Sequence, residues 1–329
     1  MPGRFSIILP IRNGGEYAKL CVNSILNQTI RDFNLIVLDN ASTDGALQWI
    51  QSLNDNRIII FSSQKSLSIE ENWSRIKTVP KNEFMTMIGH DDILKPFYLE
   101  EMDKLINLHP DAGLFQTHYS YIDKDGKITR KCLPMDEVQK SYEFLACQMN
   151  GTIDSTGTGY MMCSADFDKL GGMPVNYPNL IFSDYELWIK LSKNSYKATA
   201  QRECFEYREH MSVSRATNGE QYEAAFGQYV HFLSTLRNEE HFAEVIARYG
   251  HKMLLYFCES LSHRVLKTPV NKRKIRVKDV VKNFHVYADL LIPGQSFQPM
   301  GIPGIRYASW LDQSVLTRNT FNFINKFRH

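Results

Sequence analysis

The chain has 329 residues, of which 43% are hydrophobic and 22% charged, a composition typical of a globular protein with a buried core. Its 38 Lys and Arg nearly balance its 36 Asp and Glu, so overall charge gives no reason to expect a nucleic-acid partner. The six cysteines include no CxxC pair, so we expect neither a disulfide framework nor a zinc site. No apolar stretch is long enough to span a bilayer, and we expect a cytoplasmic protein.

Short apolar runs and helical patterns alternate over residues 1–120. Strands are expected at 5–9, 34–38, 57–61, 83–88 and 113–118, and helices at 17–28, 45–53, 67–78 and 96–108. Apolar strands that alternate with helices are typical of a mostly parallel sheet covered on both faces. The first part of the chain therefore predicts an α/β fold.

The pattern changes twice further along the chain. Asp125-Gly126 indicates a hairpin, and it is followed by helices expected at 164–170 and 183–193 and a strand at 196–200. Beyond residue 218 the sequence predicts mainly helices, at 220–237, 239–265, 277–290 and 304–326. We therefore expect two regions: an α/β domain at 1–217 and a helical C-terminal region at 218–329.

Polar clusters follow three of the predicted strands, and in parallel sheets ligands bind outside the carboxyl ends of the strands. The adjacent carboxylates Asp91 and Asp92 suit Mg²⁺ or Mn²⁺, which carboxylates hold together with substrate phosphates. Helix capping by Asp92 is the alternative interpretation. Asp39, at the end of the second strand, could accept a hydrogen bond from the ring N–H of a pyrimidine base.

A third acidic position, Asp184, lies where a helix begins in the segment SDYELW. The helix N-terminus stabilises the ionised carboxylate, which favours a proton acceptor. A simple capping role for Asp184 remains the alternative. Basic and hydroxyl groups at 207–215 could close over a diphosphate.

Five segments together resemble glycosyltransferase family 2, which is built on the GT-A nucleotide-diphosphosugar fold. They are SIILPIRNGGEYAKLCVNSILNQ, LIVLDNASTD, FMTMIGHDDILKP, SDYELWIKL and YREHMSVSR, and they fall within residues 4–215. The resemblance implies an α/β GT-A domain with a C-terminal helical extension. It also implies a single in-line displacement that inverts the anomeric centre.

The resemblance implies roles for particular positions. Six residues are expected at the donor nucleotide: Pro10, Arg12, Asn13, Asp39, Asn72 and Asp91. Asp92 is expected to be the direct ligand of Mn²⁺ or Mg²⁺, with His210 near the metal or the diphosphate. Asp184 is expected to be the catalytic base. Two departures from the family pattern stand out: Arg12 replaces a frequent Tyr, and Gly89 replaces a frequent Asp.

The Gly-, Ser- and Thr-rich segment 151–163 is expected to line the acceptor side, although a flexible structural loop is the competing interpretation. The candidates for acceptor contacts are Thr156, Gly157, Thr158 and Trp188. The implied reaction moves a sugar from a nucleotide-diphosphosugar to a hydroxyl of a glycan or lipid-linked glycan. A UDP-sugar is the expected donor. The setting expected from the family is bacterial surface-polysaccharide synthesis.

The C-terminal third carries no catalytic motif. A basic cluster at 267–278 and mixed aromatic and basic residues at 305–328 could rest on an anionic membrane surface, on the inner face of the plasma membrane. A solvated charge run, with a helix that packs on the catalytic domain or in a homo-oligomer, is the alternative. Competing functions are a nucleotide-sugar or glycan binding protein without turnover and a nucleotidyltransferase. No GxGxxG follows the first strand, which argues against a dinucleotide-dependent enzyme.

Overall fold

A computed structural model describes residues 3–209, 216–269, 271, 273–314, 316–318 and 321. The chain forms two compact units. The sheet unit comprises Met1–Phe144, Gly151–Asn176 and Ser183–Ser212. The helical unit comprises Leu145–Asn150, Tyr177–Phe182 and Val213–His329. The second unit thus takes in two short segments from inside the first two hundred residues as well as the C-terminal third.

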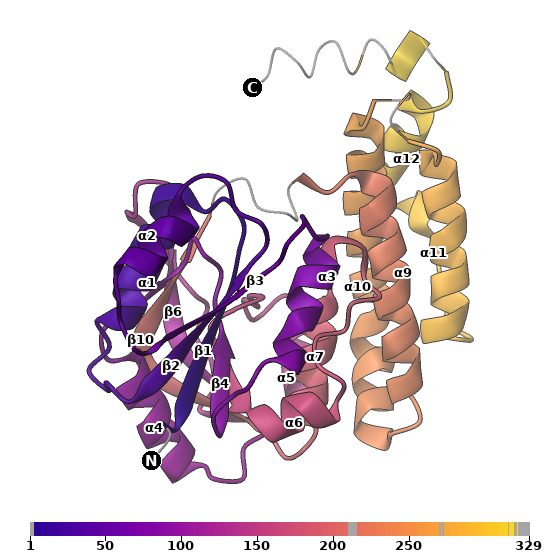
Figure 1. The fold of residues 1–329 in the computed structure, drawn as a ribbon. Helices are drawn as coiled ribbons and strands as arrows, with labels where there is room; N and C mark the ends of the chain where they lie inside the picture. The colour runs from indigo at the N-terminus through magenta and orange to yellow at the C-terminus, as the bar shows by residue number, and fades with distance from the viewer. Residues whose placement is uncertain are drawn as a thin grey trace. The chain divides into compact units, whose positions relative to one another are not determined.

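One mixed sheet forms the centre of the sheet unit (Figure 1). Its strands are β1 (Phe5–Ile11), β2 (Phe33–Asp39), β3 (Ile58–Ser62), β4 (Phe84–Met87), β5 (Ile93–Leu94), β6 (Leu114–Ile122), β7 (Ile128–Lys131), β8 (Val138–Gln139), β9 (Tyr160–Cys163) and β10 (Lys197–Arg208). The order across the sheet is β3-β2-β1-β4-β9-β6-β10-β5, with β7 beside β6 and β8 beside β10. The strands expected from the apolar runs are present, and the sheet is mostly parallel as predicted.

The sheet is parallel from β3 to β4, and β9 then runs antiparallel between β4 and β6. β9 lies at the end of the Gly-, Ser- and Thr-rich segment, where no strand is predicted. In register, Ile11 of β1 is opposite Asp39, which is opposite Ser62 of β3. The polar residues after β1, β2 and β4 therefore share one edge of the sheet.

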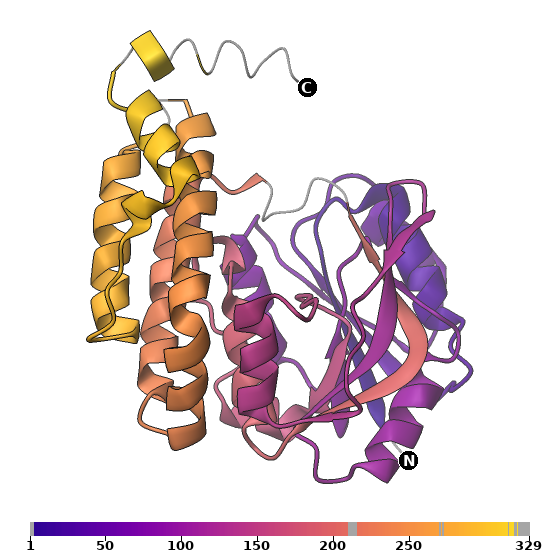
Figure 2. The same ribbon diagram turned by 180° about the vertical axis from the view of Figure 1, so that it is seen from behind.

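Helices cover both faces of the sheet. Their bounds are α1 (Gly15–Leu26), α2 (Ala46–Ser52), α3 (Ile69–Ser74), α4 (Tyr98–Leu108), α5 (Ser141–Asn150), α6 (Ser164–Lys169) and α7 (Ser183–Ser192). In Figures 1 and 2, α1, α2 and α4 lie on one face and α3 and α7 on the other. Every residue of β1 is buried, which explains why its sequence is almost continuously apolar.

The helical unit contains α9 (Gly219–Leu236), α10 (Glu240–Lys267), α11 (Val277–Leu291) and α12 (Pro303–Leu311). Its core includes stacked aromatic rings, with Phe226 on Phe284 at 5.2 Å and Phe182 on Tyr229 at 5.1 Å between centroids. The first three helices match the predicted ones closely. The fourth ends at Leu311, and residues 312–314 interrupt the predicted helix 304–326, of which residues 315, 319, 320 and 322–326 lie outside the described part of the chain. No helix in the described part of the chain is both long enough and apolar enough to cross a membrane.

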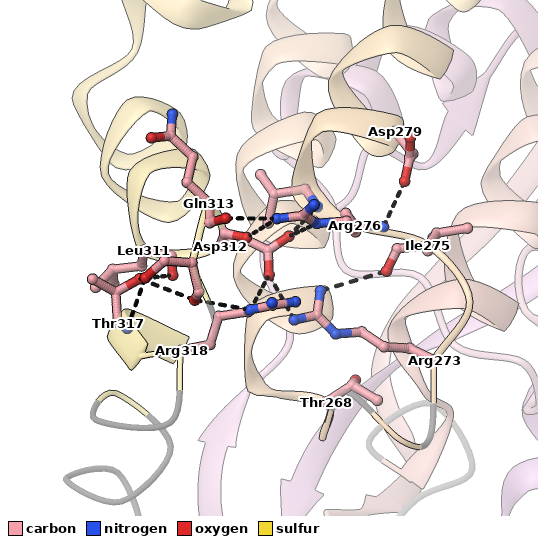
Figure 3. A network of polar contacts seen from close by, with 12 residues as sticks. Thr268, Arg273, Ile275, Arg276, Asp279, Leu311, Asp312, Gln313, Thr317 and Arg318 are labelled. Atoms are coloured by element: carbon pink, nitrogen blue, oxygen red, sulfur yellow. Dashed lines mark hydrogen bonds and ion pairs between the residues drawn. The ribbon is translucent and has the colours of Figure 1, made fainter.

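The end of α12 coincides with a buried ionic network around Asp312 (Figure 3). Arg273 Nη2 donates to Asp312 Oδ1 at 2.7 Å, and Val277 N donates to Oδ2 at 2.8 Å. Arg276 and Arg318 each place Nε 3.8 Å from a carboxylate oxygen. Asp312 thus caps the first turn of α11 and compensates guanidinium groups from two segments.

We expect Asp312→Asn to destabilise the helical unit strongly. The Arg273 side chain is only 2% exposed, so the substitution leaves a buried guanidinium without its counter-charge, a change that costs about 3–5 kcal/mol. Urea unfolding measures this, with Asp289→Asn on the exposed side of α11 as the matched control. Equal unfolding free energies for the two variants would contradict the structural role given to Asp312.

Candidate active site

Two loops at the carboxyl edge of the sheet are joined by hydrogen bonds. Asn13 has a left-handed backbone (φ 50°). Its Oδ1 accepts from Thr43 N at 2.8 Å, and its own N–H donates to Ser42 Oγ at 3.1 Å. Gly15 N donates to Asp44 Oδ2 at 2.7 Å. The Asn13 side chain therefore holds the β1 and β2 loops together.

Asp39 and Asn72 are both buried beside these loops. Asp39 Oδ1 accepts from Ser42 N at 3.2 Å. Arg75 connects the two residues, since its Nη1 donates to Asp39 O at 2.9 Å and to Asn72 Oδ1 at 2.8 Å. Pro10 is buried inside β1, whereas Arg12 is exposed. Of the donor-site candidates, Arg12 and Asn13 are exposed, and Pro10, Asp39 and Asn72 are buried.

The acidic pair lies in the short loop between β4 and β5. A β-carbon on Gly89 would lie 2.7 Å from Asp91 Oδ1 and 3.0 Å from Asp92 Oδ2. A side chain at position 89 would therefore displace the Asp91 carboxylate and press on that of Asp92, so glycine lets both carboxylates lie over this position. The family often has Asp where this chain has Gly89. The two carboxylates of Asp91 and Asp92 here occupy the space that such a side chain would need.

Arg208, the last residue of β10, holds the acidic loop in place through hydrogen bonds. Its N–H donates to Asp92 Oδ1 at 3.0 Å and its Nε to Asp91 O at 2.8 Å. Its Nη1 donates to Asp123 O at 2.7 Å, and its guanidinium lies 4.7 Å from the centre of the Tyr17 ring. A single buried arginine thus ties the acidic loop to the hairpin between β6 and β7 and to α1.

Asp92 is only 2% exposed. Its Oδ2 accepts from Thr158 Oγ1 at 2.8 Å, so both carboxylate oxygens have protein donors. Burial and the charge of Asp91 nevertheless raise the pKa of Asp92 well above its usual value, against the lowering effect of Arg208 and Thr158. The site therefore holds two carboxylates whose mutual repulsion an added cation would relieve.

The segment before β9 connects the acidic pair to Asp184. Thr158 donates a hydrogen bond to Asp92. At the preceding residue, Gly157, a β-carbon would lie 3.7 Å from Asp184 Oδ2. Two consecutive residues therefore adjoin the two carboxylates to which the sequence motifs give separate roles: Thr158 by a hydrogen bond, and Gly157 with its open side facing Asp184. Tyr207 supports this proximity, because the charges of Asp92, Asp91 and Asp184 all raise its pKa, in addition to burial.

Asp184 lies in the first turn of α7. Burial raises the pKa of Asp184 to about 6, although the backbone N–H groups of Tyr185 and of Asp184 itself lower it. From the sequence we expect the helix N-terminus to favour the anion, and the N–H groups do act in that direction. Burial has the larger effect, and the resulting pKa is closer to that of an efficient general base at neutral pH.

Three of the candidates for acceptor contacts are buried: Thr156, Thr158 and Trp188. Trp188 stacks on Tyr160 at 4.4 Å, and its Nε1 donates to Thr156 O at 3.0 Å. Thr156 Oγ1 in turn donates to Thr158 O at 2.8 Å. These side chains hold the loop in place from inside the protein, which leaves Gly157 as the candidate beside Asp184.

His210 lies outside the residues that the structure describes. Arg208 and Tyr207 are site residues to which the sequence alone assigns no individual role. Both belong to the segment YREH that carries part of the family resemblance, but their contacts depend on a 12-residue strand of which only the first part is predicted.

The acidic loop fits a divalent cation in part. No group of three or more His, Cys, Asp or Glu is arranged to hold a metal within the described ranges. Mg²⁺ and Mn²⁺ are commonly held by one or two carboxylates, with substrate phosphates and water as the other ligands. Asp91 and Asp92 provide such a pair, and burial, together with the charge of Asp91, raises the pKa of Asp92.

Solved structures share this fold. Staphylococcus aureus TarS 1–349 in complex with UDP-GlcNAc has a TM-score of 0.60 at 13% identity, covering 94% of this chain and 91% of that chain. The mannosyltransferase PcManGT from Pyrobaculum calidifontis, in complex with GDP-Man and Mn²⁺, has a TM-score of 0.52 at 13% identity, covering 99% and 88%. The fold is thus a GT-A-like α/β sheet followed by a helical region.

The chain belongs to glycosyl transferase family 2, whose sequence model matches residues 6–171. Glycosyltransferase GlyG of Streptococcus pneumoniae is 27% identical over 37% of this chain and 41% of its own length. An uncharacterized glycosyltransferase of Methanocaldococcus jannaschii is 27% identical over 58% of this chain and 66% of its own. The putative teichuronic acid biosynthesis glycosyltransferase TuaG of Bacillus subtilis is 25% identical over 62% and 78%. The chain thus spans less than two thirds of GlyG and of the M. jannaschii protein.

Proposed function

We propose that this protein is an inverting glycosyltransferase that transfers a sugar from a UDP-sugar to an acceptor hydroxyl. The observation that carries the proposal is that Thr158 donates to Asp92 while the preceding residue, Gly157, faces Asp184, whose Oδ2 would lie 3.7 Å from a β-carbon at position 157. It brings a carboxylate suited to accept a proton close to a carboxylate pair suited to a metal-bound diphosphate. Family membership and the UDP-GlcNAc named for TarS support a nucleotide-sugar donor.

In this proposal the donor nucleotide lies at the loops after β1 and β2. Asp39 is positioned at the end of β2 to accept from the base, and exposed Arg12 to contact the nucleoside or its phosphates. Asn13 and Asn72 shape the pocket through the hydrogen bonds that hold its loops and Arg75. Pro10 is buried in β1, one residue before the strand ends at Ile11.

The acidic pair has two different environments, and this suggests a division of roles. Asp92 is buried, with both oxygens occupied, whereas Asp91 is partly exposed. The family resemblance implies Asp92 as the direct metal ligand, but both of its oxygens already have protein donors. We therefore propose that Asp91 makes the direct contact with Mn²⁺ or Mg²⁺ and that Asp92 supplies supporting negative charge. When bound, the cation supplies positive charge that offsets the charge gained by the departing diphosphate.

Asp184 then accepts the proton of the acceptor hydroxyl as that oxygen attacks the sugar. Gly157 adds no side chain beside Asp184 Oδ2, so its backbone leaves room for the acceptor. We place the acceptor among glycans and lipid-linked glycans, a setting for which TuaG, named for teichuronic acid biosynthesis, is an example among the relatives.

Calorimetric titration of UDP into the purified protein tests the donor site. We expect binding with Mn²⁺ and its loss with EDTA, followed by turnover when UDP-sugars are supplied with glycan acceptors. Binding of GDP or dTDP in place of UDP would change the donor assigned here. Metal-dependent UDP binding without turnover of any UDP-sugar, including hydrolysis, would favour a binding protein of the same fold.

A further inference from the structure

Positive charge is concentrated in the last fifth of the chain. Residues 264–329 contain 12 of the 38 Lys and Arg but only 3 of the 36 Asp and Glu. The chain as a whole is almost neutral, so the rest of it carries an excess of acidic residues. Such a local asymmetry indicates a surface for an anionic partner more strongly than overall charge does.

The described part of this basic segment gathers at one end of the helical unit. Arg273 and Arg276, before and at the start of α11, contact Asp312 at the end of α12. Lys274 N donates to Glu220 in the first turn of α9 at 2.9 Å, and Arg264 in the last turn of α10 donates to Thr217 O at 2.8 Å. The ends of α10 and α12 and the starts of α9 and α11 therefore meet here, as Figure 1 shows for α10 to α12.

The structure separates these cations into two groups. Arg273, Arg276 and Arg318 are directed at Asp312 inside the unit (Figure 3) and are only partly available to a partner. The second group is exposed to solvent, and we call it the basic face: Lys267, Lys274, Lys278, Lys282 and Arg306.

Two exposed aromatic side chains lie on α12, the helix that carries Arg306 of the basic face. Tyr307 and Trp310 lie one turn apart on α12 and are 54% and 55% exposed. Their rings stack, with centroids 6.1 Å apart at 27°. The opposite side of α12 is buried through Ile305, Ala308 and Leu311, so the aromatic pair is not needed for packing. Amphipathic Trp and Tyr beside Lys and Arg are typical of surfaces at the membrane–water interface.

We propose that the basic face and the Tyr307–Trp310 pair together dock the protein on an anionic lipid surface. The lysines and Arg306 lie against acidic headgroups, and the two rings enter the headgroup layer. A second copy of this chain is a poorer occupant, because two basic faces repel each other. A nucleic acid would match the charge but gives no reason for an aromatic pair on the outer side of a helix. This inference is independent of the proposed reaction.

Flotation of the purified full-length protein with lipid vesicles tests the proposal. We expect it to float with vesicles of phosphatidylglycerol and phosphatidylcholine but not with phosphatidylcholine alone, and to be released by salt. The variant Lys274→Glu/Lys278→Glu should lower the partition coefficient at least about thirtyfold, the equivalent of two lost lysine contacts. Tyr307→Ser/Trp310→Ser should weaken binding to the same anionic vesicles and raise its sensitivity to salt.

Matched controls separate this face from general charge and aromatic effects. Lys127→Glu/Lys169→Glu makes the same charge change on the sheet unit, and Tyr256→Ser removes another exposed ring, from the middle of α10. Both controls should float like the wild type, and far-UV circular dichroism and thermal melting check that each variant is folded. Wild-type protein that stays unbound, floats equally with neutral vesicles, or binds duplex DNA instead would overturn the proposal, and so would equal losses in the control variants.

Discussion

Asp184→Asn should lose nearly all sugar transfer while it binds UDP and Mn²⁺ as the wild type does. The carboxylate lies beside Gly157 in the first turn of α7, at a position suited to take the proton of the attacking hydroxyl. Loss of one general base typically lowers a rate by about 10²–10⁴-fold. Asparagine keeps the size of the side chain but cannot accept the proton, so kcat should fall far more than donor affinity. Transfer assays and calorimetry on the same preparation measure the two effects.

The pH dependence of the wild type gives a second readout of the same residue. The pKa of Asp184 is raised to about 6 by burial, and only the ionised form is a base, so transfer should fall as the pH drops below about 6. Asp184→Asn should lack this acid limb in its residual activity. Asp166→Asn, the same substitution in the first turn of α6, is the matched control and should keep both rate and pH profile. If Asp184→Asn instead lost UDP binding, the residue would belong to the donor site.

The fold is largely predictable because its strands are buried and locally distinct. β1 and β2 read as apolar runs with polar residues after them, and this pattern depends only on burial between two helical layers. β9 is not predicted, because a four-residue strand in a segment rich in Gly, Ser and Thr gains its stability from pairing with β4 and β6. The long β10 is predicted only in part, since its pairing with β6 is interrupted by register shifts after Ala200.

For the candidate site, the sequence indicates the residue types but not the contacts between them. Carboxylates at strand ends follow from the topology, so Asp39, Asp91 and Asp92 can be proposed from the order of strands and helices alone. The role of Arg208 cannot be proposed from the sequence, because it depends on where the last residue of β10 contacts a loop more than a hundred positions earlier. The burial of Trp188 behind the 156–158 loop likewise arises from tertiary packing, which helical periodicity alone does not reveal.

Asp91→Asn should abolish metal-dependent UDP binding and yet make the metal-free protein more stable. The charge of Asp91 contributes to raising the pKa of buried Asp92, which means that at neutral pH the two carboxylates destabilise the folded state when no cation is present. Removing the more exposed of the two charges relieves this repulsion. We expect a gain of about 1 kcal/mol, which corresponds to a rise in melting temperature of about 2–4 °C for a domain of this size.

Thermal melts with EDTA and with Mn²⁺ plus UDP measure both effects on one sample. The wild type should gain stability from Mn²⁺ and UDP, because a ligand that binds only the folded state shifts unfolding to higher temperature. Asp91→Asn should have a higher melting temperature than the wild type in EDTA, and Mn²⁺ plus UDP should not raise it further. Asp111→Asn removes an exposed charge before β6, and it should melt and respond like the wild type. A lower melting temperature for Asp91→Asn with EDTA would contradict the repulsion, whereas a retained response to Mn²⁺ and UDP would assign the metal contact to Asp92.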